Sequence, residues 1–309
     1  MKGYRIRHSQ LFFRKGPGRA IYLMEGLIRI GDLVALMLCA EYAKQIEGRR
    51  IAFQLLDDTH KALRAEVLFS NTIDDLLTVE GPGFGLQDPG ALEIFDPGPL
   101  WIAATHYHSK YGARLVPRLS FDPALYRGPE LEWGSYAVFH PLFAPAYNEG
   151  RGMEEGFVNT FCDQLVQALG DRALVVTDHP EKIHSSIRVV ATESLYDLVY
   201  LIGRSKVYLG GDTGFTHFAA AGRVPHLFAL YGPNYFHDFV TAYTDICFGD
   251  LVHPFATLGT YIGTPADTRP KHDPAATNLH FHVLGNNRLP ASEMEAVVVQ
   301  VRAILDGGA

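Results

Sequence analysis

Apolar and polar positions alternate most clearly in the second half of the chain. Short apolar runs that predict strands are separated there by segments whose apolar residues recur at helical spacing. Strands are expected over 136–140, 173–177, 187–190, 206–210 and 226–231, and helices over 154–169, 195–202, 215–221 and 290–305. Because this alternation is typical of a parallel sheet with helices on both faces, we expect a doubly wound α/β domain.

Two of these helices carry start signals in the sequence. Ser194 can cap the helix over 195–202, with Asp197 three residues further on. Pro290 and a capping box from Ser292 to Glu295 are expected to open the last helix. The resemblance described below allows this helix to pack back toward the N-terminal half.

The first half of the chain opens with a similar but shorter pattern. A strand over 20–24, a helix over 32–46 and a strand over 50–56 form a unit of the parallel-sheet kind. Glycine and proline are dense over 81–99, which favours loops, and again over 123–134, which is the candidate linker. We therefore predict two domains, 1–130 and 131–309.

Composition narrows the possible functions. The 309 residues carry a net charge of −7 with no run of Lys or Arg, which argues against a nucleic-acid partner. The longest nearly apolar stretch, 33–43, is too short to span a membrane. No secretory signal is evident, and three scattered cysteines are best explained as buried thiols, so we expect a cytoplasmic protein.

The strongest candidate site is the glycine-bearing turn 210–214 between a strand and a helix. Such a turn leaves the backbone amides of Thr213, Gly214 and Phe215 at a helix N-terminus, where the helix dipole also favours an anion such as a diphosphate. The alternative is that Asp212 or Thr213 only caps the helix while the glycines make a tight turn. Taken alone, the turn leaves both interpretations open.

The turn belongs to a longer ordered pattern. It comprises Leu195-x-x-Leu198-x-x-Leu201-Ile202, then Gly211-Asp212-Thr213-Gly214-x-x-His217-x-Ala219-Ala220-Ala221-Gly222, then Pro225 and Tyr231-Gly232-Pro233. Near the N-terminus, Arg29-Ile30-Gly31-Asp32 precedes an apolar helix. These two patches, about residues 20–46 and 194–233, resemble the heptosyltransferase-like glycosyltransferases of family 9. The resemblance implies the GT-B fold, in which two facing Rossmann-like, doubly wound domains enclose a cleft. Residues 1–130 would then form the acceptor-binding domain and residues 131–309 the domain that binds the nucleotide-sugar donor.

The resemblance also implies roles for individual residues. Asp32 would be the general base of an inverting glycosyl transfer, taking the proton from the acceptor hydroxyl. Gly211, Asp212, Thr213, Gly214 and His217 would lie at the donor pocket, with the Thr213 and Gly214 amides holding the diphosphate. The alternatives are an N-cap role for Asp32 and a partly buried, packing histidine at 217.

The loops after the first two strands of the second half depart from the family pattern. Where the family has a basic residue near the donor phosphates, the loop 141–152 offers only Arg151. His140, at the end of the preceding strand, either lines the donor site or simply terminates the strand. After the next strand, Asp178 or Glu181 stands where the family has an acidic residue at the ribose, although a solvated loop explains both.

Histidine pairs raise the question of a metal site. His106/His108 and His280/His282 have i, i+2 spacing, which places both members of a pair on one face of a strand. Neither pair has a cysteine or carboxylate at characteristic ligand spacing. We therefore expect no metal site and no cofactor, with a nucleotide sugar as co-substrate.

Three functions remain open from the sequence. The first is an inverting glycosyltransferase that moves a sugar from a nucleotide diphosphate, with an ADP-sugar and a heptose implied only by the resemblance. The second is a nucleotide-sugar epimerase or hydrolase on the same scaffold, and the third is a sugar-nucleotide-binding subunit without activity. The partners of the first are a nucleotide sugar and a glycosyl acceptor, and a lipid-linked acceptor would bring the protein to a membrane surface.

Overall fold

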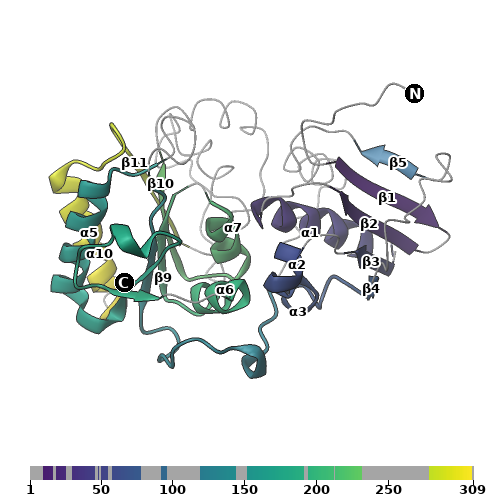
Figure 1. The fold of residues 1–309 in the computed structure, drawn as a ribbon, viewed down its shortest axis with the longest axis horizontal. Coiled ribbons are helices and arrows are strands. Elements are labelled where there is room, and N and C mark those ends of the chain that lie inside the picture. Colours follow the sequence, from purple (N-terminus) through teal and green to yellow (C-terminus); the bar gives the residue numbers. More distant parts are fainter. Residues whose placement is uncertain are drawn as a thin grey trace. The chain divides into compact units, whose positions relative to one another are not determined.

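The computed structural model describes residues 10–16, 19–25, 30–45, 48, 50–54, 58–77, 92–95, 119–143, 152–190, 194–211, 213–231 and 278–307. The chain divides into two compact units, Met1–Ala124 and Leu125–Ala309, each of which is described separately (Figure 1). The division falls within the segment 123–134 that the sequence indicates as a linker. The acceptor and donor roles assigned to 1–130 and 131–309 stay predictions.

The described residues of the first unit form a five-stranded sheet and three α-helices, drawn in purple and blue in Figure 1. The strands are β1 Gln10–Gly16, β2 Arg19–Glu25, β3 Arg50–Gln54, β4 Asp75–Leu77 and β5 Leu92–Phe95, in the order β4-β3-β2-β1-β5. The helices are α1 Ile30–Gln45, α2 Asp58–Leu63 and α3 Ala65–Leu68. Because β2 and β3 are parallel and α1 lies between them in sequence, the predicted strand, helix, strand unit is confirmed.

This sheet is mixed, which corrects the expectation of a doubly wound sheet in both halves. Strand β1 runs antiparallel to both β2 and β5. Strand β5 lies inside the segment 81–99 for which the sequence favoured loops. Both strands escape a pattern-based prediction because β1 mixes aromatic with basic residues and β5 is flanked closely by glycine and proline.

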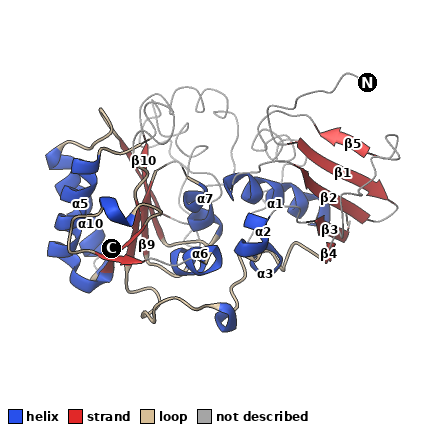
Figure 2. Cartoon of the chain, viewed as in Figure 1, coloured by secondary structure: helices blue, strands red, loops and turns tan. Residues whose placement is uncertain are grey.

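The second unit is built on a six-stranded, all-parallel sheet (Figure 2). Its strands are β6 Ala137–His140, β7 Ala173–Val176, β8 Arg188–Val190, β9 Val207–Gly210, β10 His226–Tyr231 and β11 Asn278–Val283. Their order, β11-β10-β9-β6-β7-β8, is that of a doubly wound nucleotide-binding domain. The predicted α/β class and the five strands expected here are confirmed, and β11 is an addition.

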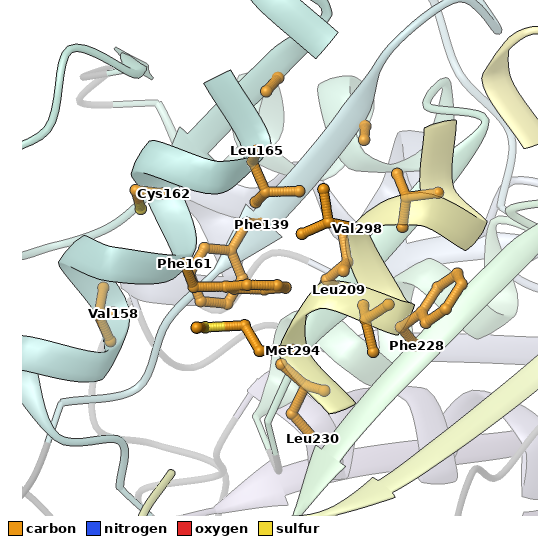
Figure 3. Close-up of a cluster of buried hydrophobic side chains, with 14 of the residues drawn as sticks. Phe139, Val158, Phe161, Cys162, Leu165, Leu209, Phe228, Leu230, Met294 and Val298 are labelled. Atoms are coloured by element: carbon orange, nitrogen blue, oxygen red, sulfur yellow. The ribbon is translucent and has the colours of Figure 1, made fainter. Parts of the chain in front are cut away.

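Among the residues that the structure describes, four α-helices cover the two faces of this sheet. They are α5 Glu155–Leu169, α6 Leu195–Gly203, α7 Gly214–Ala221 and α10 Ala291–Leu305. One buried cluster joins α5 and α10 to side chains such as Phe139 and Leu209 (Figure 3). A second buried cluster, which includes Tyr208, joins α6 and α7 to the opposite face. Helices on both faces explain why β6, β7 and β9 are buried along their whole length.

The start signals of two helices have different outcomes. The Ser194 side chain accepts a hydrogen bond from the Asp197 backbone amide at 3.2 Å, which confirms the predicted cap of α6. Helix α10 begins at Ala291 after Pro290, with no side-chain cap, so the predicted capping box from Ser292 is wrong. The buried face of α10 packs on α5 within the second unit. None of the helices among the described residues is both long and apolar enough to cross a bilayer.

The linker is fastened to the second unit by aromatic stacking. The ring of Tyr126 stacks on Tyr200 of α6 with centroids 4.5 Å apart, and Trp133 meets the same ring edge-on at 5.1 Å. The Arg127 backbone amide donates to the buried Asp197 carboxylate at 3.0 Å. These contacts fix the chain that leads into β6, which is the first strand of the six-stranded sheet in sequence.

We expect two neighbouring valines of α10 to respond oppositely to truncation. Val301 is fully buried, so Val301→Ala should lower the free energy of unfolding by about 2 kcal/mol through lost burial and a residual cavity. Val299 is 61% exposed, and Val299→Ala should leave stability unchanged or raise it slightly, because alanine is the better helix former. Urea unfolding measures both, and equal effects would contradict this packing of α10.

Candidate functional site

The site lies where the strand order of the second sheet reverses. Strand β6 is first in sequence, β7 and β8 follow on one side of it, and β9 pairs with its other side. In this pairing His140, the last residue of β6, lies opposite Gly210, the last residue of β9. Helices that leave such neighbouring strands in opposite directions open a crevice at the carboxyl ends, where open α/β sheets bind ligands.

His140 is held against the first turn of α7. Its Nδ1 atom lies 3.3 Å from the hydroxyl oxygen of Thr213, and its ring meets the Phe215 ring edge-on with centroids 4.8 Å apart. The side chain is 6% exposed, and this burial lowers the pKa of His140 to about 4, although the Asp178 carboxylate acts to raise it. The imidazole is therefore neutral near pH 7 and lies beside the turn, and its role in lining the donor site stays a prediction.

Gly210 and Gly211 differ in how closely they are packed. A Cβ atom on Gly210 would lie 2.5 Å from the Tyr208 hydroxyl, because the tyrosine ring leans along β9 over the glycine. A Cβ atom on Gly211 would meet the Leu230 carbonyl oxygen at 3.4 Å and the Met153 methyl group at 3.6 Å. The Tyr208 ring thus leaves no room for a side chain at Gly210, whereas a Cβ atom on Gly211 would make ordinary van der Waals contacts.

The hydrogen bonds of the backbone amides at the start of α7 differ from those that the sequence predicts. Thr213 occupies the N-cap position without a side-chain cap bond, since its hydroxyl faces His140. Its backbone amide donates to the Gly211 carbonyl oxygen at 2.9 Å, so the prediction that the Thr213 amide holds an anion is corrected. Helical geometry leaves the Gly214 and Phe215 amides without intrahelical acceptors, and these are the groups an anion can reach.

The buried hydroxyl groups of Tyr208 and Thr216 form hydrogen bonds that stabilise this turn. The Tyr208 hydroxyl lies 3.2 Å from the Thr216 hydroxyl oxygen, and Thr216 in turn donates to the Gly211 carbonyl oxygen. Burial raises the pKa of Tyr208, so its hydroxyl stays protonated and available for hydrogen bonding. Sequence reasoning missed both residues, although the i, i+2 spacing of Tyr208 and Gly210 in one strand was visible.

The remaining predicted residues are placed to different degrees. His217 lies in α7 and is buried beneath the turn. Asp32 lies in the first turn of α1 and not at its N-cap, a position where the helix dipole favours a carboxylate. The orientation of its side chain, together with Asp212 and Arg151, lies outside the described residues. The structure thus brings together His140, Gly211, Thr213 and Gly214, and leaves the general base a prediction.

The histidines of the second pair have partners in the sheet and in α10. His280 Nε2 lies 3.3 Å from His226 Nδ1, and its Nδ1 lies 2.8 Å from the Gln300 side-chain nitrogen. His282 Nδ1 lies 2.7 Å from the Glu293 carboxylate. Within the described part of the chain, no group of three or more metal-ligating side chains could hold an ion. His106 and His108 lie outside that part.

Comparison with known proteins rests on structure. No family model matches the sequence, and no curated protein matches it. The structure of Escherichia coli heptosyltransferase WaaC with ADP is similar at a TM-score of 0.50 and 12% identity, over 90% of this chain and 97% of that one. The glycosyl transferase family 9 structure from Veillonella parvula gives 0.50 and 12%, over 91% and 96%. The chain has the fold of the family 9 glycosyltransferases.

The family 9 fold accounts for both units of the chain, because the similarity covers nearly all of it. The resemblance inferred from two short sequence patches is therefore confirmed at the level of fold. At 12% identity the family 9 fold carries no residue roles by itself. What the switch point can do follows from its own geometry, which offers an anion two helix amides, a threonine hydroxyl and an imidazole.

Matched glycine substitutions test the packing of the turn. Gly210→Ala should lower the free energy of unfolding by about 1–3 kcal/mol, because the buried, hydrogen-bonded Tyr208 ring cannot move aside cheaply. Gly156→Ala, in the first turn of α5, meets only the Glu154 carboxylate at 3.8 Å and should be neutral or stabilising. Chemical unfolding of both variants is the measurement, and a neutral Gly210→Ala would contradict the close contact.

Titration of His140 should make the free energy of unfolding depend on pH in the acid range. Its pKa of about 4 lies below the unfolded value near 6.5, so the folded state binds fewer protons and stability falls as the pH drops between these values. Wild type should lose about 3 kcal/mol more than His140→Gln from pH 6.5 to 4. Urea midpoints across this range measure the difference, and parallel pH profiles would show that His140 titrates normally.

Proposed function

We propose that the chain is a glycosyltransferase that moves a sugar from a nucleotide diphosphate to an acceptor hydroxyl with inversion of configuration. The observation that carries this proposal is the convergence of His140, Thr213 and the first turn of α7 at the switch point of the second sheet. This arrangement suits a diphosphate, which is the leaving group of such a reaction. The family 9 fold adds support, since it belongs to enzymes that transfer sugars.

The proposed chemistry divides between the two units. The Gly214 and Phe215 amides and the dipole of α7 would stabilise the negative charge that develops on the departing diphosphate. Asp32, at the start of α1, would take the proton from the acceptor hydroxyl as its oxygen attacks the anomeric carbon. Direct displacement by that oxygen inverts the anomeric configuration, so a separate covalent intermediate on the protein is not needed.

The nature of the donor follows from the comparison and is part of the proposal. Because the heptosyltransferase with this fold was solved with ADP, we infer an ADP-sugar, with a heptose as the first candidate. No metal or cofactor is required by the scheme, since helix amides offset the charge of the leaving group. The buried thiol of Cys162 fits the reducing cytoplasm, where nucleotide sugars are available. A lipid-linked glycan acceptor would bring the protein to a membrane surface.

The proposed base is tested by a variant that keeps its shape. Asp32→Asn should retain binding of ADP-glucose or ADP-heptose, measured by thermal shift, while transfer to an acceptor falls by roughly 10²- to 10⁴-fold. Loss of a general base affects the proton transfer and leaves the diphosphate site intact. Asp163→Asn, an exposed change on α5, serves as the matched control and should retain full transfer.

The other outcomes separate the competing functions. Unchanged transfer by Asp32→Asn would remove this residue from the mechanism. Rapid epimerisation or stoichiometric hydrolysis of the nucleotide sugar without acceptor would favour the epimerase or hydrolase. Tight donor binding with no turnover across a broad acceptor panel would favour a binding subunit.

A further inference from the structure

The imidazole of His140 has a hydrogen-bond partner at only one of its two nitrogens among the described residues. Nδ1 is hydrogen bonded to Thr213, whereas Nε2 forms no hydrogen bond with any residue that the structure describes. The side chain is 6% exposed, so little of the ring meets solvent. The ring thus lies beside the first turn of α7 with one nitrogen available to a ligand that binds there.

Burial keeps the ring neutral in the free protein. Burial is the largest influence, and Asp178 after β7 is the charged group in the described chain that acts on the imidazole. The residues that touch it, Thr213 and Phe215, carry no charge. The N-terminal end of α7 carries partial positive charge, which also disfavours a second positive group. In the free protein, neutral imidazole is therefore the stable form of the His140 side chain.

Resting on the proposed function, we propose that His140 supplies the positive charge for the donor diphosphate by taking up a proton from solvent when the nucleotide sugar binds. The diphosphate brings two negative charges to the first turn of α7, beside the ring. An anion within about 4–6 Å favours imidazolium, typically by about 1–3 pKa units. Between the free pKa of about 4 and the raised pKa of the complex, the site thus becomes cationic only when its ligand is bound.

The bond to Thr213 is compatible with this change of charge. In the neutral ring the hydroxyl can donate to Nδ1, which leaves the proton of the ring on Nε2. In the imidazolium both nitrogens donate, and the hydroxyl can rotate to accept from Nδ1. Nε2 then presents a charged N–H group to the ligand, and the turn keeps its geometry in both states.

Proton uptake gives the affinity a defined pH dependence. Above the pKa of His140 in the complex, neither state is protonated and the affinity is constant. As the pH falls below that value, the complex binds a proton that the free protein lacks, so the affinity rises tenfold per pH unit until the free pKa of about 4 is reached. If binding raises the pKa by two units, affinity should rise about tenfold from pH 8 to pH 5.

Calorimetry can measure this proton directly. We would titrate the full chain with ADP-glucose and UDP-glucose, whose diphosphate diesters have no titration of their own in this range. At pH 5.5, heats in buffers of different ionisation enthalpy should give an uptake of roughly half a proton or more per bound ligand. Nitrogen NMR of the histidine side chains, with and without ligand, should show the same proton on His140.

Three variants separate His140 from other sources of the proton. His140→Gln should abolish the uptake and the gain in affinity at low pH. Asp178→Asn changes a side chain that is 84% exposed, so it should fold normally and shift the uptake to lower pH, because the carboxylate favours imidazolium. His184→Gln, a surface histidine beside Glu155, should behave as wild type.

The outcomes distinguish this inference from the proposed function. Binding without proton uptake in wild type, or uptake that persists in His140→Gln, overturns the role of His140 and leaves the glycosyltransferase proposal standing. Uptake in Asp178→Asn identical to that of wild type would also overturn it. Failure of both nucleotide sugars to bind from pH 5 to pH 8 would overturn both proposals.

Discussion

The pairing of β6 with β9 is the constraint on which the rest of the second unit depends. It joins the first strand of the sheet to one that follows it by about seventy residues, and it places His140 opposite Gly210. Parallel strands bring their carboxyl ends to the same edge, so the side chain that ends β6 meets the turn that ends β9. A register slip of one residue would turn His140 to the opposite face of the sheet.

Packing on both faces holds that register. Phe139 belongs to the cluster beneath α5 and α10, whereas Val138 belongs to the cluster beneath α6 and α7. Neighbouring residues of one strand are thus fixed by different layers, and a slip would expose both clusters at once. Helix α10 completes one of these layers, so the last residues of the chain stabilise a site formed by residues far from them in sequence.

Sequence reasoning succeeded where local signals and tertiary structure agree. Ser194 caps α6 as expected, and the strands of the second sheet read as apolar runs because they are buried on both faces. It missed β1 and β11, where charged residues or histidines interrupt the apolar pattern of each strand. Contacts such as that of His140 with Thr213 join residues 73 positions apart, so no local spacing encodes them.

A histidine suits position 140 because the site has two states, one free and one with a bound anion. A lysine or arginine would stay charged in the free protein. Its charge would then be desolvated by burial and would face the positive end of α7, which is unfavourable. A neutral amide would avoid that penalty but would offer the diphosphate no charge. Imidazole is stable without charge when the site is empty and accepts a proton within reach of physiological pH. Burial, which lowers the pKa of His140, therefore confines its positive charge to the complex with the anion.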